Sequence, residues 1–266
     1  AMVHKRDTLP YILAARSFLS RVPAQHVVVV SDPTLDDDCQ SAIRRHLPHT
    51  EFTESTNWQH RGLPTGGTWE RLQAIADFCR NRYVVQLDAD TLSVAELSEV
   101  RQAIAGDTSF VLSTEDDQVA SSLEDATRWA RNRAATKKVV PTQLACESAL
   151  DSLLSLGLRS YIRGCSGFAG FHRGSINIEQ LLSVSSIMSG ALGARWSEWG
   201  TEQFTSNLLC SNSHRFVPLP HPKYTPPGRY KRDETAFLHF IGYERFKSSL
   251  YAELARIEVN SIIASC

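Results

Sequence analysis

The chain has 266 residues, and its 28 lysines and arginines nearly balance its 29 aspartates and glutamates. The resulting net charge of −1 argues against a general nucleic-acid binder, which usually carries a basic excess. With 42% hydrophobic and 21% charged residues, the composition is that of an ordinary globular protein. A chain of this length can bury a core without the help of disulfides.

No apolar run reaches the roughly 18 residues of a membrane-spanning helix, and the first residues lack the apolar core of a signal peptide. The six cysteines are scattered without a CxxC pair, which is typical of reduced thiols rather than of a disulfide framework or a zinc site. We therefore expect a cytoplasmic protein without a transmembrane segment. Basic residues between Lys223 and Arg232 leave open a peripheral contact with the inner face of the membrane.

The first part of the chain alternates helix-like and strand-like runs. Its elements are predicted, in chain order, as a helix over 9–19, a strand over 26–31, helices over 36–47 and 66–80, a strand over 83–87, a helix over 94–105 and a strand over 109–112. The strands are continuous apolar runs, which are typical of strands buried on both faces. Alternation at this spacing favours an α/β fold with a mostly parallel sheet flanked by helices.

The second part is less regular. Helices are predicted over 143–156, 178–188 and 201–210, with a glycine-punctuated strand or turn over 164–171. The prolines between Pro218 and Gly228 argue against any regular structure there. A strand over 236–240 and a last helix from about Tyr243 complete a single domain.

The strongest local signal is the pair Asp88 and Asp90, which directly follows a predicted buried strand. In open α/β sheets ligands bind beyond the carboxyl ends of the strands, and two such carboxylates can share Mg²⁺ or Mn²⁺. In the alternative interpretation Asp88 simply ends the strand and Asp90 caps the next helix. A phosphatase of the haloacid dehalogenase type also uses paired aspartates, but Leu92 stands where its motif has Thr or Val.

Two later segments carry further candidates. His239 lies at the end of a predicted strand, where it could ligate the same cation or serve as a hydrogen-bonded core histidine. Glu202 begins a helix beside Trp196 and Trp199, an arrangement that suits a sugar site. In the alternative interpretation Glu202 only stabilises the helix through its favourable interaction with the helix dipole. We expect both tryptophans to lie in the core.

The order of these motifs resembles that of the GT-A glycosyltransferases, which use nucleotide-sugar donors. The nearest pattern is that of the glycogenin and lipopolysaccharide galactosyltransferase family. The motifs that carry the resemblance are, in order, Gly66-Gly67-x-x-x-Arg71, Asp88-Ala89-Asp90, the pair Glu202-Gln203 and His239-Phe240-x-Gly242-x-x-Arg245. Two departures keep the charge: Glu202 stands for an aspartate of the family, and Arg245 stands for a lysine.

The resemblance implies roles for the charged residues. Asp88, Asp90 and His239 would hold Mn²⁺ or Mg²⁺ on the diphosphate of the donor, where the metal stabilises the leaving nucleoside diphosphate. Arg245 and Lys247 would add positive charge at the diphosphate. Arg71 would either reach the same diphosphate or face solvent.

Other positions would complete a donor site. Asp32 would bind the base or the ribose, and its alternative is a turn residue before Pro33. Gly167 would let the backbone approach the donor sugar, and Gln203 would bind the donor beside Glu202. Residues 1–115 would form the nucleotide-sugar-binding half of the domain. Residues 116–266 would form the acceptor side, with the Pro-rich segment 212–235 as a lid or acceptor-binding loop.

Glu202 would be the catalytic residue. In an inverting enzyme it would act as general base on the acceptor hydroxyl, and in a retaining enzyme it would orient the donor sugar. The resemblance of the Glu-Gln pair and the His-Phe-x-Gly motif to the glycogenin-like family implies retention, which we favour, whereas the run Trp199-Gly200-x-Glu202 resembles inverting galactosyltransferases. The expected reaction transfers a hexose from a UDP- or GDP-sugar to an acceptor hydroxyl on a bacterial surface glycan or a protein.

Two alternatives remain at this point. A sugar nucleotidyltransferase would also use paired aspartates and Mg²⁺, but no phosphate loop rich in glycine and basic residues appears over 1–35. A non-catalytic glycan-binding protein could keep the same scaffold, although the four acidic and histidine candidates are all present.

Overall fold

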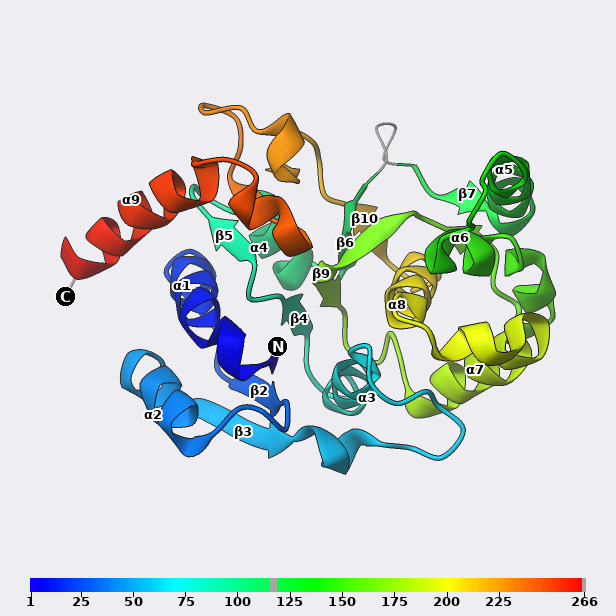
Figure 1. Ribbon diagram of the computed structural model, residues 1–266, viewed down its shortest axis with the longest axis horizontal. Coiled ribbons are helices and arrows are strands. Elements are labelled where there is room, and N and C mark those ends of the chain that lie inside the picture. Colours follow the sequence, from blue (N-terminus) through cyan, green and yellow to red (C-terminus); the bar gives the residue numbers. More distant parts are fainter. Residues whose placement is uncertain (115–118, 265–266) are drawn as a thin grey trace.

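The computed structural model describes residues 1–114 and 119–264 (Figure 1). The helices are α1 (Thr8–Leu19), α2 (Asp37–His46), α3 (Trp69–Phe78), α4 (Ser98–Ala105), α5 (Leu123–Ala135), α6 (Thr142–Glu147), α7 (Ile178–Leu192), α8 (Thr201–Ser211) and α9 (Leu250–Ala264). The strands are β1 (Met2–Val3), β2 (Val27–Ser31), β3 (Thr50–Glu54), β4 (Val84–Leu87), β5 (Thr91–Ser93), β6 (Ser109–Ser113), β7 (Ser121–Ser122), β8 (Ser160–Tyr161), β9 (Gly164–Phe171), β10 (Phe216–Pro218), β11 (Tyr224–Thr225) and β12 (Phe237–His239).

The α/β class predicted from the sequence is confirmed. Strands β1, β2 and β3 form one sheet and are parallel throughout. A second sheet has the order β10-β6-β9-β4, and in it β9 runs antiparallel to both neighbours. A third sheet joins β11, β12 and β5. Figure 1 shows helices α1, α2 and α9 at one end of the molecule and α5, α6 and α7 at the other.

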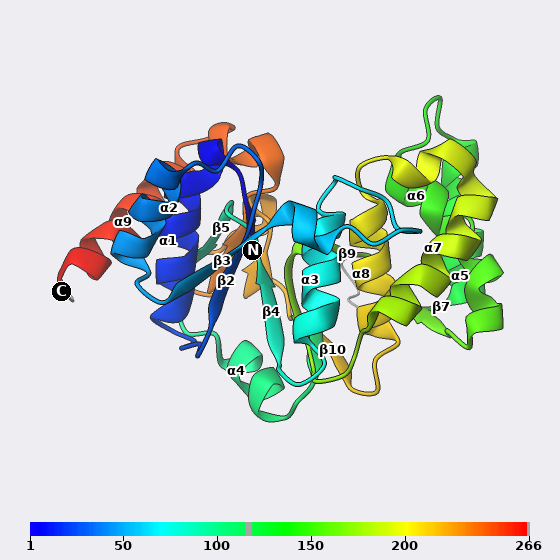
Figure 2. The same ribbon diagram turned by 90° about the horizontal axis from the view of Figure 1, so that it is seen from below.

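Strand β9 is the centre of the molecule, and all eight of its residues are buried. Its glycines permit this position, because a Cβ atom at Gly170 would lie 2.3 Å from the ring of Phe110 on β6. Helices α3 and α8 lie side by side next to β4 and β9 (Figure 2). Strand β9 therefore lies between β6 and β4 in the sheet and packs against α8, while α3 packs against β4 and α8.

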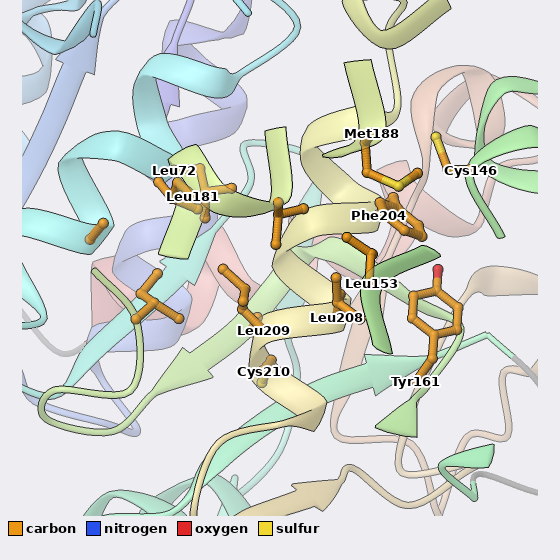
Figure 3. Packing of buried hydrophobic residues seen from close by; sticks show 14 of the residues in the cluster. Leu72, Cys146, Leu153, Tyr161, Leu181, Met188, Phe204, Leu208, Leu209 and Cys210 are labelled. Atoms are coloured by element: carbon orange, nitrogen blue, oxygen red, sulfur yellow. The ribbon is translucent and has the colours of Figure 1, made fainter. Parts of the chain in front are cut away.

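Two hydrophobic clusters hold these elements. The larger one surrounds α8, whose Phe204 and Leu208 pack in the same cluster as Tyr161 of β8 and Met188 of α7 (Figure 3). In the second cluster Phe168 of β9 stacks on Phe237 of β12, with ring centroids 3.9 Å apart. This stacking fixes β12 against β9, although the two strands belong to different sheets.

Strand register places three chain segments at one point. Leu87 of β4 pairs with Phe168, and the next residue, Asp88, donates its N–H to the carbonyl of Gly167 over 2.8 Å. Strand β12 runs antiparallel to β5, so that His239 pairs with Thr91. The ends of β4 and β12 and the middle of β9 therefore meet.

The remaining differences from the predictions have local causes. The predicted helix 143–156 breaks into α6 and a 3-10 segment over Leu150–Leu156. Side chains of Ser148 and Ser152 donate to backbone carbonyls there, which competes with continued α-helix. The last α-helix begins at Leu250 rather than near Tyr243, after a 3-10 turn over Gly242–Phe246.

Strand β3 and helix α5 were not predicted, because both carry mostly polar, half-exposed sequences at the edges of the fold. The prediction that 218–228 holds no regular structure is wrong. Pro218 ends edge strand β10, where a missing N–H is tolerated, and β11 lies within the proline-rich stretch. Among the described residues, no helix combines the length and apolar character needed to span a membrane.

Candidate active site

Asp88, Asp90 and His239 converge at the carboxyl end of β4. One ligand atom from each lies within 4.8 Å of the other two. His239 Nε2 is 3.0 Å from Asp90 Oδ1, and the N–H of Gly242 donates to Asp90 Oδ2 over 3.1 Å. The interpretation of Asp90 as a helix cap is wrong, because its carboxylate has these partners and α4 begins only at Ser98. Two carboxylates and an imidazole form a donor set that suits a divalent cation.

The surroundings of His239 set its charge. The side chain is 4% exposed, and its Nδ1 lies 3.1 Å from Cys165 Sγ. Burial lowers the pKa of the imidazole, but the Cys165 sulfur and the Asp90 carboxylate outweigh it and hold the pKa well above its ordinary value. The same contact lowers the pKa of the Asp90 carboxyl, against the upward effect of its burial. Without a cation, the pair therefore favours an ionic hydrogen bond.

Arg71 lies beneath the cluster and does not face solvent. Its side chain is 4% exposed and forms an ion pair with Asp88. Its other terminal nitrogen lies 3.5 Å from both oxygens of Glu202 and from the hydroxyl of Ser166. Burial lowers the pKa of the guanidinium, but the carboxylates of Asp88 and Glu202 outweigh it and keep the pKa raised. Arg71 thus joins the candidate metal ligands to the candidate catalytic residue.

Glu202 lies in the first turn of α8 and is 2% exposed. Its Oε2 accepts hydrogen bonds from the hydroxyls of Thr68 over 2.9 Å and Ser166 over 3.1 Å. Burial raises the pKa of this carboxyl, and the charge of Arg71 opposes that rise. The carboxylate is therefore held by three groups, two from the N-terminal end of α3 and one from β9.

Gln203 anchors the same helix to β9. Its Oε1 accepts the N–H of Ser166 over 3.3 Å, and its Nε2 donates to Gln143 Oε1 over 2.8 Å. Gly167 follows Ser166 on β9, and its lack of a side chain is required by the packing of His239. A Cβ atom there would lie 2.0 Å from Cε1 of His239, so only glycine leaves room for the imidazole.

The two C-terminal cations differ in position. Arg245 is 15% exposed, lies 3.4 Å from Asp7 and contributes to the lowered pKa of Asp90. Lys247 is 47% exposed, and its ammonium contacts Glu244 and lies 4.3 Å from the centre of the Tyr243 ring. The structure therefore brings Arg245 towards the carboxylate cluster and directs Lys247 to its own neighbours on the surface.

Asp32 belongs to a separate group of side chains. It accepts the N–H of Thr34 over 2.9 Å and lies 3.1 Å from His4 Nδ1. Burial raises its pKa, but the bonds from Thr34 and the charge of His4 outweigh this and lower it. The role of Asp32 towards a base or ribose stays a prediction.

Sequence reasoning missed Thr68 and Cys165. Thr68 adopts φ 72°, a left-handed conformation that a β-branched residue rarely takes, and its hydroxyl reaches Glu202. It ends the run Gly66-Gly67-Thr68, in which all three residues have positive φ. The glycine pair was the available signal for this turn, and nothing in the sequence pointed to the threonine or the cysteine.

The two tryptophans, Trp196 and Trp199, lie in different environments. Trp196 is 3% exposed, and its indole N–H donates to Ser185 Oγ over 2.9 Å, as expected of a core residue. The expectation of a core position is wrong for Trp199, which is 73% exposed. Its backbone lies beside Gly67, since a Cβ atom there would be 3.7 Å from Trp199 Cα. An exposed indole therefore borders the turn that carries Thr68.

No protein family model matches this chain, and no curated protein matches it in sequence. Solved structures do match in fold. An active-site mutant of LgtC is 12% identical, with a TM-score of 0.58 over 98% of this chain and 94% of that one. The galactosyltransferase LgtC with donor and acceptor sugar analogues gives 10% identity and a TM-score of 0.53 over 96% and 94%. The bifunctional glycosyltransferase WbbM gives 12% and 0.54, over 96% of this chain and 50% of its own.

At such identities the likeness shows the fold alone. The chain has the fold of the GT-A glycosyltransferases, as the motif order in its sequence implied. The carboxylate and histidine cluster lies at the carboxyl end of strand β4, next to β9 in the second sheet.

Proposed function

We propose that this chain is a metal-dependent glycosyltransferase, which moves a hexose from a UDP- or GDP-sugar to an acceptor hydroxyl on a glycan or a protein. The observation that carries the proposal is the convergence of Asp88, Asp90 and His239 within 4.8 Å, in a fold shared with glycosyltransferases. Asp90 and His239 are 149 residues apart in the sequence. The pairing of β12 with β5 brings their side chains together.

The cluster fits a divalent cation by its donor chemistry. Carboxylate oxygens suit Mg²⁺ and Mn²⁺, and an imidazole ligand favours Mn²⁺ of the two. Asp88, Asp90 and His239 would hold the ion, which when bound supplies Lewis-acid stabilisation of the leaving diphosphate. Arg245, close enough to lower the pKa of Asp90, would add positive charge on the same side.

Arg71 has a positioning role in this scheme. Its guanidinium is paired with Asp88 and lies 3.5 Å from Glu202, so that it orients one carboxylate towards the donor and holds the other. Removal of the Arg71 side chain would leave the Glu202 carboxylate buried without a positively charged partner, which costs free energy in a protein interior. We expect Arg71→Ala to damage both the metal cluster and the position of Glu202.

Glu202 is better suited to orienting the donor sugar than to taking a proton. Its carboxylate is 2% exposed and already accepts hydrogen bonds from Thr68 and Ser166. At this burial the side chain would have to become accessible before an acceptor hydroxyl could reach either carboxylate oxygen. This network supports the retaining outcome that the Glu-Gln pair favours.

The test is hydrolysis of the donor without acceptor. Purified protein is incubated with UDP- and GDP-hexoses in Mn²⁺ or in EDTA, and the release of free sugar is followed by NMR. We expect slow release from one donor, lost in EDTA and in Asp90→Asn. The matched control is Asp77→Asn, since Asp77 is an exposed partner of Arg80 and should leave the rate unchanged.

The same spectra separate the alternatives. A first product of unchanged anomeric configuration supports retention, and the opposite anomer supports inversion. Release of sugar 1-phosphate on addition of pyrophosphate would indicate a nucleotidyltransferase instead. If the protein binds glycans but releases no sugar from any donor in either condition, the proposed activity is wrong.

A further inference from the structure

His239 is held on both sides by residues of a single strand. Cys165 and Gly167 are two positions apart on β9, in the stretch where its pairing with β6 is irregular, and both positions lie against the ring of His239. Cys165 Sγ lies 3.1 Å from His239 Nδ1. At Gly167 a Cβ atom would come within 2.0 Å of Cε1 and 2.5 Å of Nε2 of the same ring. Contacts from this one strand therefore restrict the orientation of the His239 ring.

The orientation decides which nitrogen is available. Nε2 faces Asp90 at 3.0 Å and belongs to the candidate metal cluster, whereas Nδ1 faces away from it, towards Cys165. An imidazole can ligate a cation through Nε2 only when that nitrogen offers a lone pair, and the neutral ring then carries its hydrogen on Nδ1. The only group that the structure places at Nδ1 among the described residues is Cys165 Sγ.

We propose that Cys165 is a positioning residue for the metal site: its sulfur accepts the Nδ1–H of His239 and so selects the tautomer whose Nε2 points at the cation. The proposal rests on the metal site of the proposed function. Histidine ligands in proteins regularly donate their second N–H to a partner, usually an oxygen, and this partner stabilises the ligand orientation. Here a buried sulfur, 4% exposed, takes that place.

The test is the affinity for Mn²⁺, measured by EPR titration of free ion in the absence of any nucleotide. We expect Cys165→Ala to raise the dissociation constant about 10- to 100-fold, the usual effect of losing such a partner. Cys165→Ser keeps an acceptor oxygen at the same position and should stay within about threefold of the wild type, because its hydroxyl can still accept the Nδ1–H. Cys146→Ala removes another fully buried thiol, in α6, and should leave the affinity unchanged.

Each outcome decides the question. Equal affinity of wild type, Cys165→Ala and Cys165→Ser, with Asp90→Ala clearly weaker, would overturn the role of Cys165 and leave the metal site standing. If the wild type binds Mn²⁺ no better than Asp90→Ala, the metal site itself is wrong, and this inference falls with it. Should Cys165→Ala fail to fold, Cys165→Val fills the space without offering an acceptor and takes its place. Loss in Val but not in Ser supports the hydrogen bond over simple packing.

Discussion

At the scale of single residues, the convergence of Asp88, Asp90 and His239 agrees with the sequence, whereas their roles stay predictions. The aspartates were identified by their place directly after a predicted buried strand, and the histidine by its place in the order of the motifs. Thr68 and Cys165 were not, because their importance depends on a left-handed turn and on a neighbour 74 residues away. Exposure of Trp199 was also beyond the sequence, since the same residue type at Trp196 is buried.

Replacement of Gly167 tests the packing of His239. In Gly167→Ala the new methyl group would overlap the imidazole, so the ring must turn away from the cluster. We expect Mn²⁺ affinity to fall at least about tenfold, as when a ligand orientation is lost. Isothermal titration with MnCl₂ measures this, and Gly190→Ala, where a Cβ atom meets nothing within 4 Å, is the control. Unchanged affinity in Gly167→Ala would contradict the described position of His239.

Trp199 provides a test on the acceptor side. Its exposed indole borders the turn that holds Glu202, and aromatic faces pack well on sugar rings. Trp199→Ala should raise the KM for acceptor about two- to tenfold, consistent with the loss of one stacking contact, and leave donor hydrolysis unchanged. Steady-state kinetics with varied acceptor give both values. The half-exposed Trp129 on α5 serves as control, and an equal rise in Trp129→Ala would argue against a specific stacking role.

At the level of elements, predictions succeeded where the hydrophobic pattern was strong. The buried runs that became β2, β4 and β6 and the helices α1, α2 and α8 were all predicted to within a few residues. The failures lie in polar edge elements such as β3 and α5, and in β11 among prolines. Antiparallel insertion of β9 between β4 and β6 leaves no mark in the sequence, because a strand buried on both faces reads alike in either direction.

The contact between β9 and β12 can be tested by its aromatic pair. Phe168 is fully buried and stacks on Phe237, with Phe18 and Phe110 at its edges. Phe168→Ala should destabilise the fold by about 3–5 kcal/mol, the cost of removing a core phenylalanine. Chemical denaturation measures the loss. Phe246→Ala, at an 80% exposed ring, should change stability by less than about 0.5 kcal/mol, and equal losses in both would refute the described packing.

An ion pair ties α4 to the segment before β12. Lys223 Nζ lies 2.8 Å from Glu99, and the Tyr224 hydroxyl donates to the same carboxylate over 2.9 Å. Burial raises the pKa of Glu99, but these partners outweigh it and lower the pKa below its ordinary value. A lowered pKa in the folded state contributes stability that is present at neutral pH and is lost as the pH falls through that pKa.

The expected pH dependence follows from that sign. Glu99→Gln should melt a few degrees below the wild type at pH 7, and the gap should close as the pH falls below the ordinary range of glutamate and the wild-type carboxyl takes up a proton. Thermal denaturation over this pH range measures the gap. Glu96→Gln removes an exposed partner of Arg101 and should show little gap at any pH. A gap for Glu99→Gln that does not narrow at any acidic pH at which both proteins stay folded would contradict the pairing.

For the whole molecule, the α/β class and the GT-A fold followed from the sequence, whereas the arrangement of the site did not. The order of the motifs named the fold, but only the register of β12 against β5 brings His239 to Asp90. The division into a nucleotide-sugar half and an acceptor half stays a prediction, as does the role of the segment 212–235. Its Lys223 and Tyr224 are fixed to α4, so a lid would have to move around these contacts.

The most direct test of the central claim is a thermal-shift panel with UDP, GDP, CMP and ADP, each with and without Mn²⁺, on wild type and Asp90→Ala. We predict that one nucleoside diphosphate raises the melting temperature only with Mn²⁺, and that Asp90→Ala abolishes the shift. At a hundredfold excess over the dissociation constant, the stabilisation should reach about 2.7 kcal/mol. If no nucleotide shifts the wild type with or without Mn²⁺, the cluster of Asp88, Asp90 and His239 does not bind a donor, and the proposed function is wrong.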